Sequence, residues 1–180
     1  MTPTIPSTRR RQIIEAARRL LEEQGPEALS MRNVAAEIGI RAPSLYEHVT
    51  DKRALESAII ADALTEQGEA QLAFLENYHG DDPLTGIAKN YRQWALDHPH
   101  LYRLVFSRDL DRDEPAVVTA EHLAAQPMRR ITGGDISASR AIWAFAHGMV
   151  SLELADRFPP DTDIDELWLR GIAALKTMLV

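Results

Sequence analysis

The stretch from Ser30 to Lys52 constrains the fold most, because it contains two short apolar patterns separated by a glycine. In its first half the apolar residues recur at i, i+3, i+4 and i+7, which places them on one face of a helix: Met31, Val34, Ala35 and Ile38. Ser30 precedes this run in the position of an N-cap, and Gly39 follows it, where a residue that tolerates positive φ can end a helix. A second helix is expected to begin at Ala42-Pro43, because proline suits the first turn of a helix.

The second predicted helix has an inward and an outward side. Leu45 and Val49, four residues apart, are expected to be buried. The residues left to the outside or the rim are Arg41, Ser44, Tyr46, Glu47 and His48. Two helices with a short glycine-containing turn form a helix-turn-helix, whose second helix can enter the major groove of DNA. A helical hairpin with no DNA-binding role would show the same apolar spacing.

The segment GIRAPSLYEHVTDKRAL makes the interpretation more specific. It resembles the recognition helix and the following linker of the tetracycline-repressor (TetR) family of bacterial transcription regulators. The residues that match the pattern of that family are Gly39, Leu45, Tyr46, His48, Lys52 and Leu55. The sequence departs from the pattern at Arg41 and Pro43, in the part that reads bases, and at Val49, where phenylalanine is usual. The resemblance therefore implies a DNA-binding domain, but it does not supply the operator.

A second resemblance covers the C-terminal part of the chain. Trp143, His147 and Gly148 match a Trp-x-x-x-His-Gly signature that is found in one subgroup of TetR-like C-terminal domains, the Trp-His-Gly (WHG) type. The segment YRQWALDHPHLYRLVFS is also similar to those domains. The two resemblances imply a regulator with a C-terminal domain that binds a small molecule.

Charge is unevenly distributed along the 180 residues, whose formal net charge is −7. Residues 1–55 have a balance of +2 and residues 56–180 a balance of −9. An acidic remainder repels DNA and helps to fix which face binds it, although ordinary charge scatter would also give a difference of this size. The chain has no cysteine, no apolar run as long as a membrane span and no signal peptide, so a cytoplasmic protein is expected.

Apolar periodicity and helix breakers predict an all-α protein with two domains. Residues 1–52 are expected to form the helix-turn-helix DNA-binding domain, with residues 1–7 as a disordered arm. Residues 53–180 are expected to form a helical domain that binds an effector and dimerises. Outside the helix-turn-helix, the predicted helices span residues 8–24, 51–76, 83–98, 101–106, 115–130, 137–157 and 164–179.

Four residues bear on the ends and continuity of these helices. Gly68 could interrupt the helix at 51–76, and Pro127 is expected to kink or end the helix at 115–130. Asp163 is expected to cap the last helix, with Glu166 at the capping-box position.

The candidate DNA-binding residues come from the three N-terminal helices and the start of the fourth. They are Arg9, Arg10, Arg11, Ser30, Arg32, Arg41, Ala42, Pro43, Ser44, Tyr46, His48 and Lys52. Arg41 could bind guanine O6 and N7 or hold a phosphate, and Ser44 could contact either a base edge or a phosphate. Ala42 and Pro43 could meet a thymine methyl group.

The remaining candidates are expected on the DNA backbone. The three adjacent arginines at the start of the first helix could contact phosphates or a minor groove, or they could be a solvated helix end. Ser30 and Arg32 lie at a helix N-terminus, which favours anions. Tyr46 and His48 are expected to hold the backbone, and Lys52 is placed for a phosphate, as the resemblance also implies.

An effector pocket is implied by the family resemblance and not by spacing. The candidates for it are Trp94, His98, Tyr102, Phe106, Trp143, His147 and Met149. Together they would supply an apolar pocket with a few polar groups, which suits a largely apolar small molecule. Core packing is the alternative for each of these residues, and a structural role for His147.

The last two predicted helices, at about 137–158 and 164–179, are apolar over more than one face, so each must be buried against more than one neighbour. A four-helix bundle formed by two subunits explains this pattern, and a solitary domain core is the alternative. A dimer also suits DNA reading, because two helices related by a twofold axis read a palindrome.

The sequence as a whole predicts a homodimeric transcription regulator, most simply a repressor that a small-molecule effector releases from a palindromic operator in double-stranded DNA. The alternative is a helical ligand-binding or enzymatic protein whose N-terminal hairpin is only structural. Sequence does not separate a repressor from an activator. No metal-ligand spacing, glycine-rich phosphate loop or nucleophile elbow is present, so neither an enzyme nor a cofactor is expected.

Overall fold

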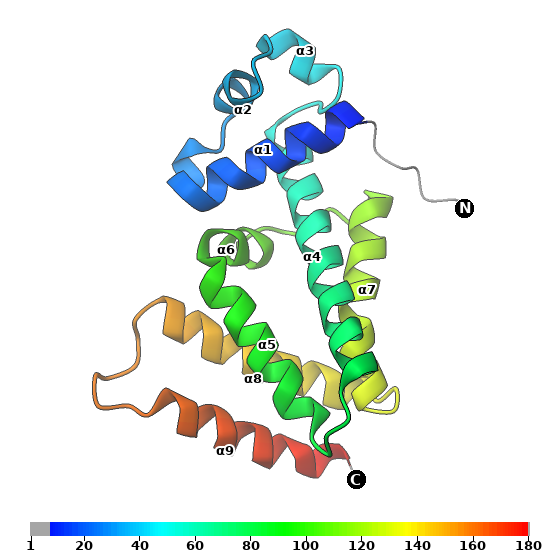
Figure 1. The fold of residues 1–180 in the computed structure, drawn as a ribbon, viewed down its shortest axis with the longest axis vertical. Coiled ribbons are helices and arrows are strands. Elements are labelled where there is room, and N and C mark those ends of the chain that lie inside the picture. The colour runs from blue at the N-terminus through cyan, green and yellow to red at the C-terminus, as the bar shows by residue number, and fades with distance from the viewer. Residues whose placement is uncertain (1–7, 180) are drawn as a thin grey trace. The chain divides into compact units, whose positions relative to one another are not determined.

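The computed structural model describes residues 8–179, and over this range it contains α-helices and two short 3-10 helices with no strand (Figure 1). In chain order the α-helices are α1 (Thr8–Gln24), α2 (Met31–Glu37), α3 (Ala42–Tyr46), α4 (Lys52–Asn77), α5 (Pro83–Asp97), α6 (Pro99–Ser107), α7 (Pro115–Ile131), α8 (Ile136–Leu154) and α9 (Ile164–Lys176). The 3-10 helices are η1 (Pro26–Ala28) and η2 (Thr177–Leu179). The predicted all-α fold is confirmed, whereas the predicted arm at residues 1–7 lies outside the described residues.

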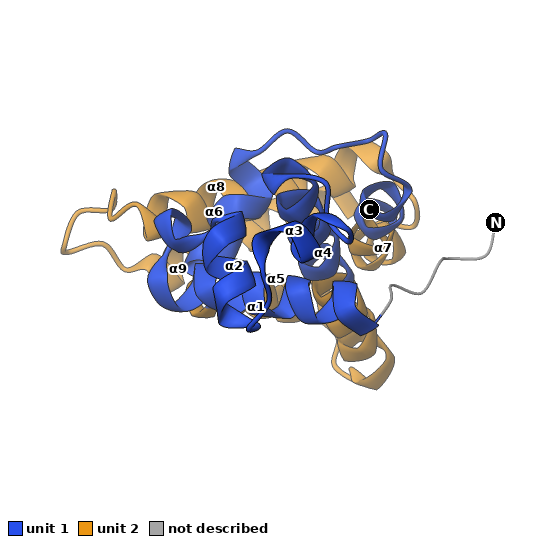
Figure 2. Ribbon diagram, turned by 90° about the horizontal axis from the view of Figure 1, so that it is seen from above, with its two compact units in different colours: residues 1–65, 98–122 blue, residues 66–97, 123–180 orange. Residues whose placement is uncertain are grey.

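Contacts divide the chain into two compact units (Figure 2). The first contains the described part of residues 1–65 together with residues 98–122, and the second contains residues 66–97 and 123–180. The chain changes unit after residue 65, inside α4, after residue 97, between α5 and α6, and after residue 122, inside α7. α6 therefore belongs to the same unit as the helix-turn-helix. The functional boundary at residue 52 stays a prediction.

The first unit is built around α1, one face of which is apolar and buried. Its apolar face is made of Ile13, Ile14, Ala17, Leu20 and Leu21, all of which are buried. α2, η1 and α6 pack against this helix. α6 contributes an amphipathic face, since Leu101, Tyr102, Leu104 and Val105 are buried.

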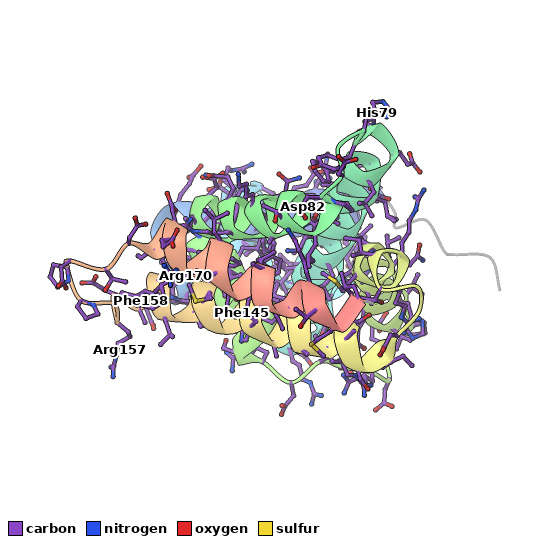
Figure 3. All side chains as sticks on the ribbon, turned by 90° about the horizontal axis from the view of Figure 1, so that it is seen from below. His79, Asp82, Phe145, Arg157, Phe158 and Arg170 are labelled. Atoms are coloured by element: carbon purple, nitrogen blue, oxygen red, sulfur yellow. The ribbon has the colours of Figure 1, made fainter. Side chains whose placement is uncertain are left out.

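The second unit is held together by α5, α8 and α9, each of which packs against the other two. Gly171 on α9 makes the contact with α8 close, because a Cβ at that position would overlap the ring of Phe145. Figure 3 labels Phe145 where α8 and α9 run side by side. The Phe145 ring also meets Trp168 edge-on at 5.7 Å. Arg92 on α5 joins the three helices, since it pairs with Glu153 on α8 at 2.7 Å and with Asp165 on α9 at 2.5 Å.

Two helices, α8 and α4, differ from their predicted course, the first for a local reason and the second because of a contact with another helix. α8 ends at Leu154 and not at Arg157, because Asp156 has a φ of 51° and the amide of Arg157 bonds back to the carbonyl of Leu152. α4 continues through Gly68, where a Cβ would lie 2.9 Å from the backbone of Leu123 on α7. Glycine at this position therefore permits a close approach of two helices and does not interrupt α4.

α7 does not end at its internal proline, since it runs through Pro127 to Ile131. The last helix has the predicted cap, because the Asp163 carboxylate accepts a hydrogen bond from the amide of Glu166 at 2.9 Å. It is α-helical as far as Lys176 and then tightens into η2. None of the described helices combines the length and the apolarity that crossing a membrane requires.

Candidate nucleic-acid interface

The turn between α2 and α3 is fixed by local hydrogen bonds. The hydroxyl of Ser30 accepts from the amide of Asn33 at 3.2 Å and so caps α2, as predicted. At the other end Gly39 adopts a φ of +67°, and the amide of Ile40 bonds back to the carbonyl of Ala35 at 2.9 Å. This pattern needs a left-handed residue, which explains a glycine in the turn.

The orientation of α3 is fixed by buried apolar residues on α3 itself, just after it and on the neighbouring α2. Leu45 is fully buried, Val49 just after the helix is nearly so, and Val34 on the neighbouring α2 is fully buried. α3 itself is short and ends at Tyr46, after which the amides of His48 and Val49 both bond to the carbonyl of Leu45. The buried side of this element is thereby anchored and its other side is presented outward.

The outward side carries the residues that sequence predicted for it. Arg41, Pro43, Ser44, Tyr46 and Glu47 are exposed, whereas Ala42 and His48 are partly buried. Tyr46 is 49% exposed, which is high for an aromatic side chain in a small helical domain. Polar and aromatic groups are thus displayed on a helix of the size that enters a major groove.

The arginine and lysine residues that are candidates for DNA binding differ in whether they form an ion pair with a carboxylate of the protein. Among residues 8–179, neither Arg32 nor Arg41 has an acidic partner, and both are exposed. Arg11, in contrast, pairs with Glu15 one turn along α1 at 3.0 Å, and Lys52 lies 3.8 Å from Glu56. Arg32 and Arg41 therefore offer their charge to a polyanion without first breaking an internal ion pair.

The other two arginines of the N-terminal triplet also begin α1. Arg9 is exposed and donates to the side-chain carbonyl of Gln12 at 3.2 Å, while Arg10 is partly buried. Consecutive residues of a helix point about 100° apart, so the three arginines cannot all face one way. The structure brings their backbones together at the helix start without making them one cluster of side chains.

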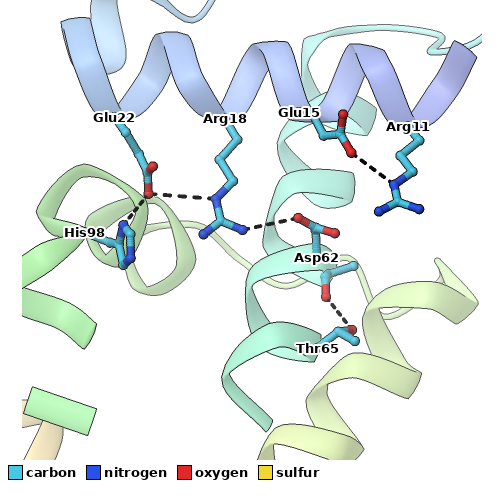
Figure 4. Close-up of polar contacts among 8 residues, drawn as sticks. Arg11, Glu15, Arg18, Glu22, Asp62, Thr65 and His98 are labelled. Carbon is cyan, nitrogen blue, oxygen red and sulfur yellow. Dashed lines mark hydrogen bonds and ion pairs between the residues drawn. The ribbon is translucent and has the colours of Figure 1, made fainter. Parts of the chain in front are cut away.

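A charged chain joins α1 to α4 and α6 within the first unit (Figure 4). Nδ1 of His98 lies 2.7 Å from Oε1 of Glu22, and Arg18 lies 3.8 Å from the same carboxylate. Arg18 also reaches Asp62 on α4 at 3.3 Å. His98, which sequence suggested for an effector pocket, therefore sits before α6 in contact with α1.

Two further pocket candidates lie together on α6. Tyr102 is buried and Phe106 is partly buried, and their ring centroids are 4.6 Å apart. Such a pair contributes to the packing of α6, which is the alternative that the sequence left open.

The remaining pocket candidates belong to the second unit. Met149 is buried, Trp94 is partly buried and Trp143 is 47% exposed. The ring of Trp143 stacks on that of His147 with the centroids 5.6 Å apart. Partial burial lowers the pKa of His147 below its ordinary value. Whether these residues contact an effector stays a prediction.

Sequence reasoning did not single out two glutamines of α4. Gln67 and Gln71 are 8% and 7% exposed, although glutamine is mostly found at the surface. Their spacing of four residues, which puts both on one side of a helix, was the only signal in the sequence.

Comparison with known proteins connects both parts of the chain to one family. A family described as "Bacterial regulatory proteins, tetR family" matches residues 13–59, and one described as "Tetracyclin repressor-like, C-terminal domain" matches residues 84–175. An uncharacterized HTH-type transcriptional regulator of Mycobacterium tuberculosis, Rv0681, is 26% identical over 93% of this chain and 81% of its own length. The class D tetracycline repressor protein of Escherichia coli is 38% identical, over 38% of this chain and 35% of that protein.

Comparison with solved structures also finds proteins of similar fold. Apo ActR from Streptomyces coelicolor superposes with a TM-score of 0.70, over 98% of this chain and 96% of that one, at 18% sequence identity. The C-terminal match alone spans more than half of the chain, and the N-terminal match covers the helix-turn-helix that the geometry displays. The chain belongs to the TetR family of bacterial regulatory proteins and is a DNA-binding transcription regulator.

Proposed function

We propose that this regulator is a homodimeric repressor that binds a palindromic operator and is released from it by a small-molecule effector. The observation that carries the dimer is the outward side of α8 and α9, where large apolar side chains remain exposed on the single chain. They are Ile136, Trp143 and Leu152 on α8 and Leu167 and Leu169 on α9. Exposed apolar groups gathered on two neighbouring helices are typical of a protein–protein interface.

The exposed side of α8 is suited to close helix packing. Ala144 and Gly148 follow each other at a spacing of one turn, and a Cβ added at Gly148 would meet nothing within 4 Å. Trp143 and His147 run beside them as a stacked pair. Small residues let two helix backbones approach, and flanking aromatic rings fill the space between them.

α9 continues the surface with a similar composition. Ala173 is exposed beside Leu169, and the nearby charges of Glu166 and Arg170 neutralise each other in an ion pair at 2.6 Å. Two such helices from each subunit would form a four-helix bundle. Residues of about 137–158 and 164–179 are therefore the proposed dimer contact.

In the dimer, the two copies of α3 would fit into successive major grooves of the DNA, which lie about 34–36 Å apart along the duplex. Arg41, Ala42, Pro43 and Ser44 are proposed to face bases. The proposed backbone contacts are Arg9, Arg10, Arg11, Ser30, Arg32, Tyr46, His48 and Lys52. The first group would determine which DNA sequence is recognised, and the second group would contribute affinity for DNA of any sequence.

The effector is proposed to bind in the C-terminal domain, which is proposed to be of the WHG type. It can release the operator only by binding better to the state in which the two recognition helices no longer match the grooves. A largely apolar molecule suits the aromatic candidates of that domain. Catalysis has no part in this proposal, and a cytoplasmic protein that acts on chromosomal DNA is its setting.

Selection of bound duplexes from a random DNA pool tests the proposal, followed by a salt titration on the selected sequences. The expected result is an enriched palindrome that binds one dimer and whose binding falls steeply as salt rises. Enrichment of single half-sites by a monomer would contradict the dimer, and no enrichment by protein shown by mass spectrometry to be free of small molecules would contradict operator binding.

A further inference from the structure

Two buried glutamines on α4 have polar atoms that no group within residues 8–179 engages. Nε2 of Gln67 and Oε1 of Gln71 are both buried, and neither has a hydrogen-bond partner among the described residues. Both side chains are more than nine-tenths buried. Leaving a buried amide atom unpaired carries a desolvation penalty, so two such atoms one turn apart need an explanation.

The orientation of Gln71 is set by its neighbour. Its Nε2 donates to the backbone carbonyl of Ile87 on α5 at 3.4 Å, so its Oε1 is the atom left over. The amide nitrogen must face a carbonyl, and therefore the free atom of Gln71 is an acceptor. The free atom of Gln67 is a donor. Residues four apart on a helix have Cβ atoms about 5–6 Å apart, so the donor and the acceptor can be reached by one small molecule.

Apolar residues of α4 and α5 lie near Gln71. On α4 the residue one turn after Gln71 is Phe74, whose ring occupies the space that a Cβ at Gly86 of α5 would need. Ile87 and Tyr91 of α5 are buried. Among residues 8–179 no charged side chain forms a hydrogen bond with either glutamine, so the pair suits an uncharged polar group better than a free carboxylate or an amine.

We infer that Gln67 and Gln71 read the polar edge of the effector, which is an apolar molecule carrying a hydrogen-bond acceptor next to a donor. A lactam, a carboxamide or an un-ionised carboxylic acid has such an edge: its carbonyl accepts from Gln67 Nε2 and its N–H or O–H donates to Gln71 Oε1. This inference rests on the proposed effector response and adds the chemical class of the effector to it.

The test uses three probes of one shape: 2-quinolinone, which has the lactam edge, N-methyl-2-quinolinone, which lacks the donor, and naphthalene, which lacks both groups. Calorimetry on the full-length protein is expected to show binding of 2-quinolinone and weakening by about tenfold or more for the N-methyl compound, because a buried acceptor is then left unpaired. The side-chain amide signals of Gln67 and Gln71 in NMR spectra are expected to shift with 2-quinolinone alone.

Variants separate recognition from stability. Gln67→Met and Gln71→Met keep the volume of the side chain and remove the unpaired polar atoms, and Gln71→Met also removes the 3.4 Å hydrogen bond to Ile87. The melting temperature is therefore expected to stay the same in the first variant and to change little in the second, while each weakens 2-quinolinone binding by about tenfold or more. Gln126→Met, the same change at an exposed position of α7, is the matched control and is expected to bind like the natural protein.

Equal binding of 2-quinolinone and its N-methyl form, unchanged binding by both glutamine variants, or no binding of 2-quinolinone to the natural protein would each overturn the inference. DNA binding by the same preparations without probe keeps this failure apart from that of the proposed function. A protein that binds its selected palindrome as a dimer and ignores 2-quinolinone loses only the assignment of the two glutamines.

Discussion

Nδ1 of His98 lies 2.7 Å from the Glu22 carboxylate, so the start of α6 is joined to the end of α1 (Figure 4). The same carboxylate is 3.8 Å from Arg18, which also reaches Asp62 on α4. α1 is the helix on which α2 packs, and α2 holds α3. The contact therefore links α6 to the element that supports the recognition helix.

Glu22→Gln tests the energetic weight of this contact. The substitution keeps the size of the side chain and removes its charge, so the contact with His98 and the ion pair with Arg18 weaken together. Both partners of the His98 contact are only about one-quarter to one-third exposed, and we expect the free energy of unfolding to fall by about 0.5–1 kcal/mol in urea titrations.

Glu23→Gln is the control for this prediction, because Glu23 is exposed on the same helix next to Glu22. It is expected to leave the urea midpoint nearly unchanged. Equal losses in the two variants would mean that the general charge of α1, and not the contact with α6, accounts for the effect.

Arg41→Ala and Arg32→Ala should separate base reading from phosphate binding. Arg41 precedes α3 and is proposed to face bases, so its removal is expected to cost about 1–3 kcal/mol on the selected palindrome and to relax the preference at one position of each half-site. Arg32 lies at the start of α2, and Arg32→Ala is expected to lower the affinity for all duplexes by the same factor. It is also expected to reduce the slope of log affinity against log salt by about 1 per lost phosphate contact.

Binding of each variant to a set of singly substituted palindromes, read by fluorescence anisotropy at several salt concentrations, distinguishes the two roles. If Arg41→Ala lowered the affinity for every duplex by the same factor, Arg41 would hold a phosphate, which is the alternative that its chemistry also allows.

Local rules predicted most of the fold. The Ser30 cap, the turn at Gly39, the burial of Leu45 and the Asp163 cap each depend on residues close in sequence, and all were found as expected. The end of α8 was misplaced because aspartate rarely takes a positive φ, and the spacing of apolar residues gives no sign that Asp156 does so.

Tertiary contacts account for what the sequence did not reveal. The role of Gly68 depends on Leu123, which is far away in the chain, and the partner of His98 is on a helix 70 or more residues earlier. Likewise, burial of Gln67 and Gln71 follows from the packing of α4 and cannot be read from two polar residues at helical spacing. The DNA-binding residues remain predictions, since they depend on a partner molecule.

Ala144→Arg tests the proposed dimer. Ala144 is exposed on α8 beside Gly148, so a long cation there leaves the single chain unstrained but cannot be buried against a second copy without a partner charge. We expect a monomer by sedimentation and a loss of about tenfold or more in affinity for the palindrome, because two linked half-sites bind better than one.

The matched control is Ala70→Arg, which introduces the same side chain at an exposed alanine of α4. It is expected to stay dimeric and to bind the palindrome normally. A dimeric Ala144→Arg variant would place the subunit contact on another surface.

Burial of His147 predicts that acid weakens the folded protein. Because burial lowers the pKa of the folded imidazole below its ordinary value of 6.5, the unfolded chain takes up the proton first as the pH falls. Stability linked to His147 is therefore complete above pH 6.5 and is lost progressively below it, down to the folded pKa.

His147→Gln cannot titrate, so its unfolding free energy should fall less than that of the natural protein between about pH 7 and pH 5. Urea titrations at one protein concentration give this difference, since dimerisation makes apparent stability depend on concentration. The other five histidines are present in both proteins, so their contributions cancel in the comparison. Parallel pH profiles for the two proteins would mean that the imidazole is as well solvated in the folded protein as in the unfolded chain.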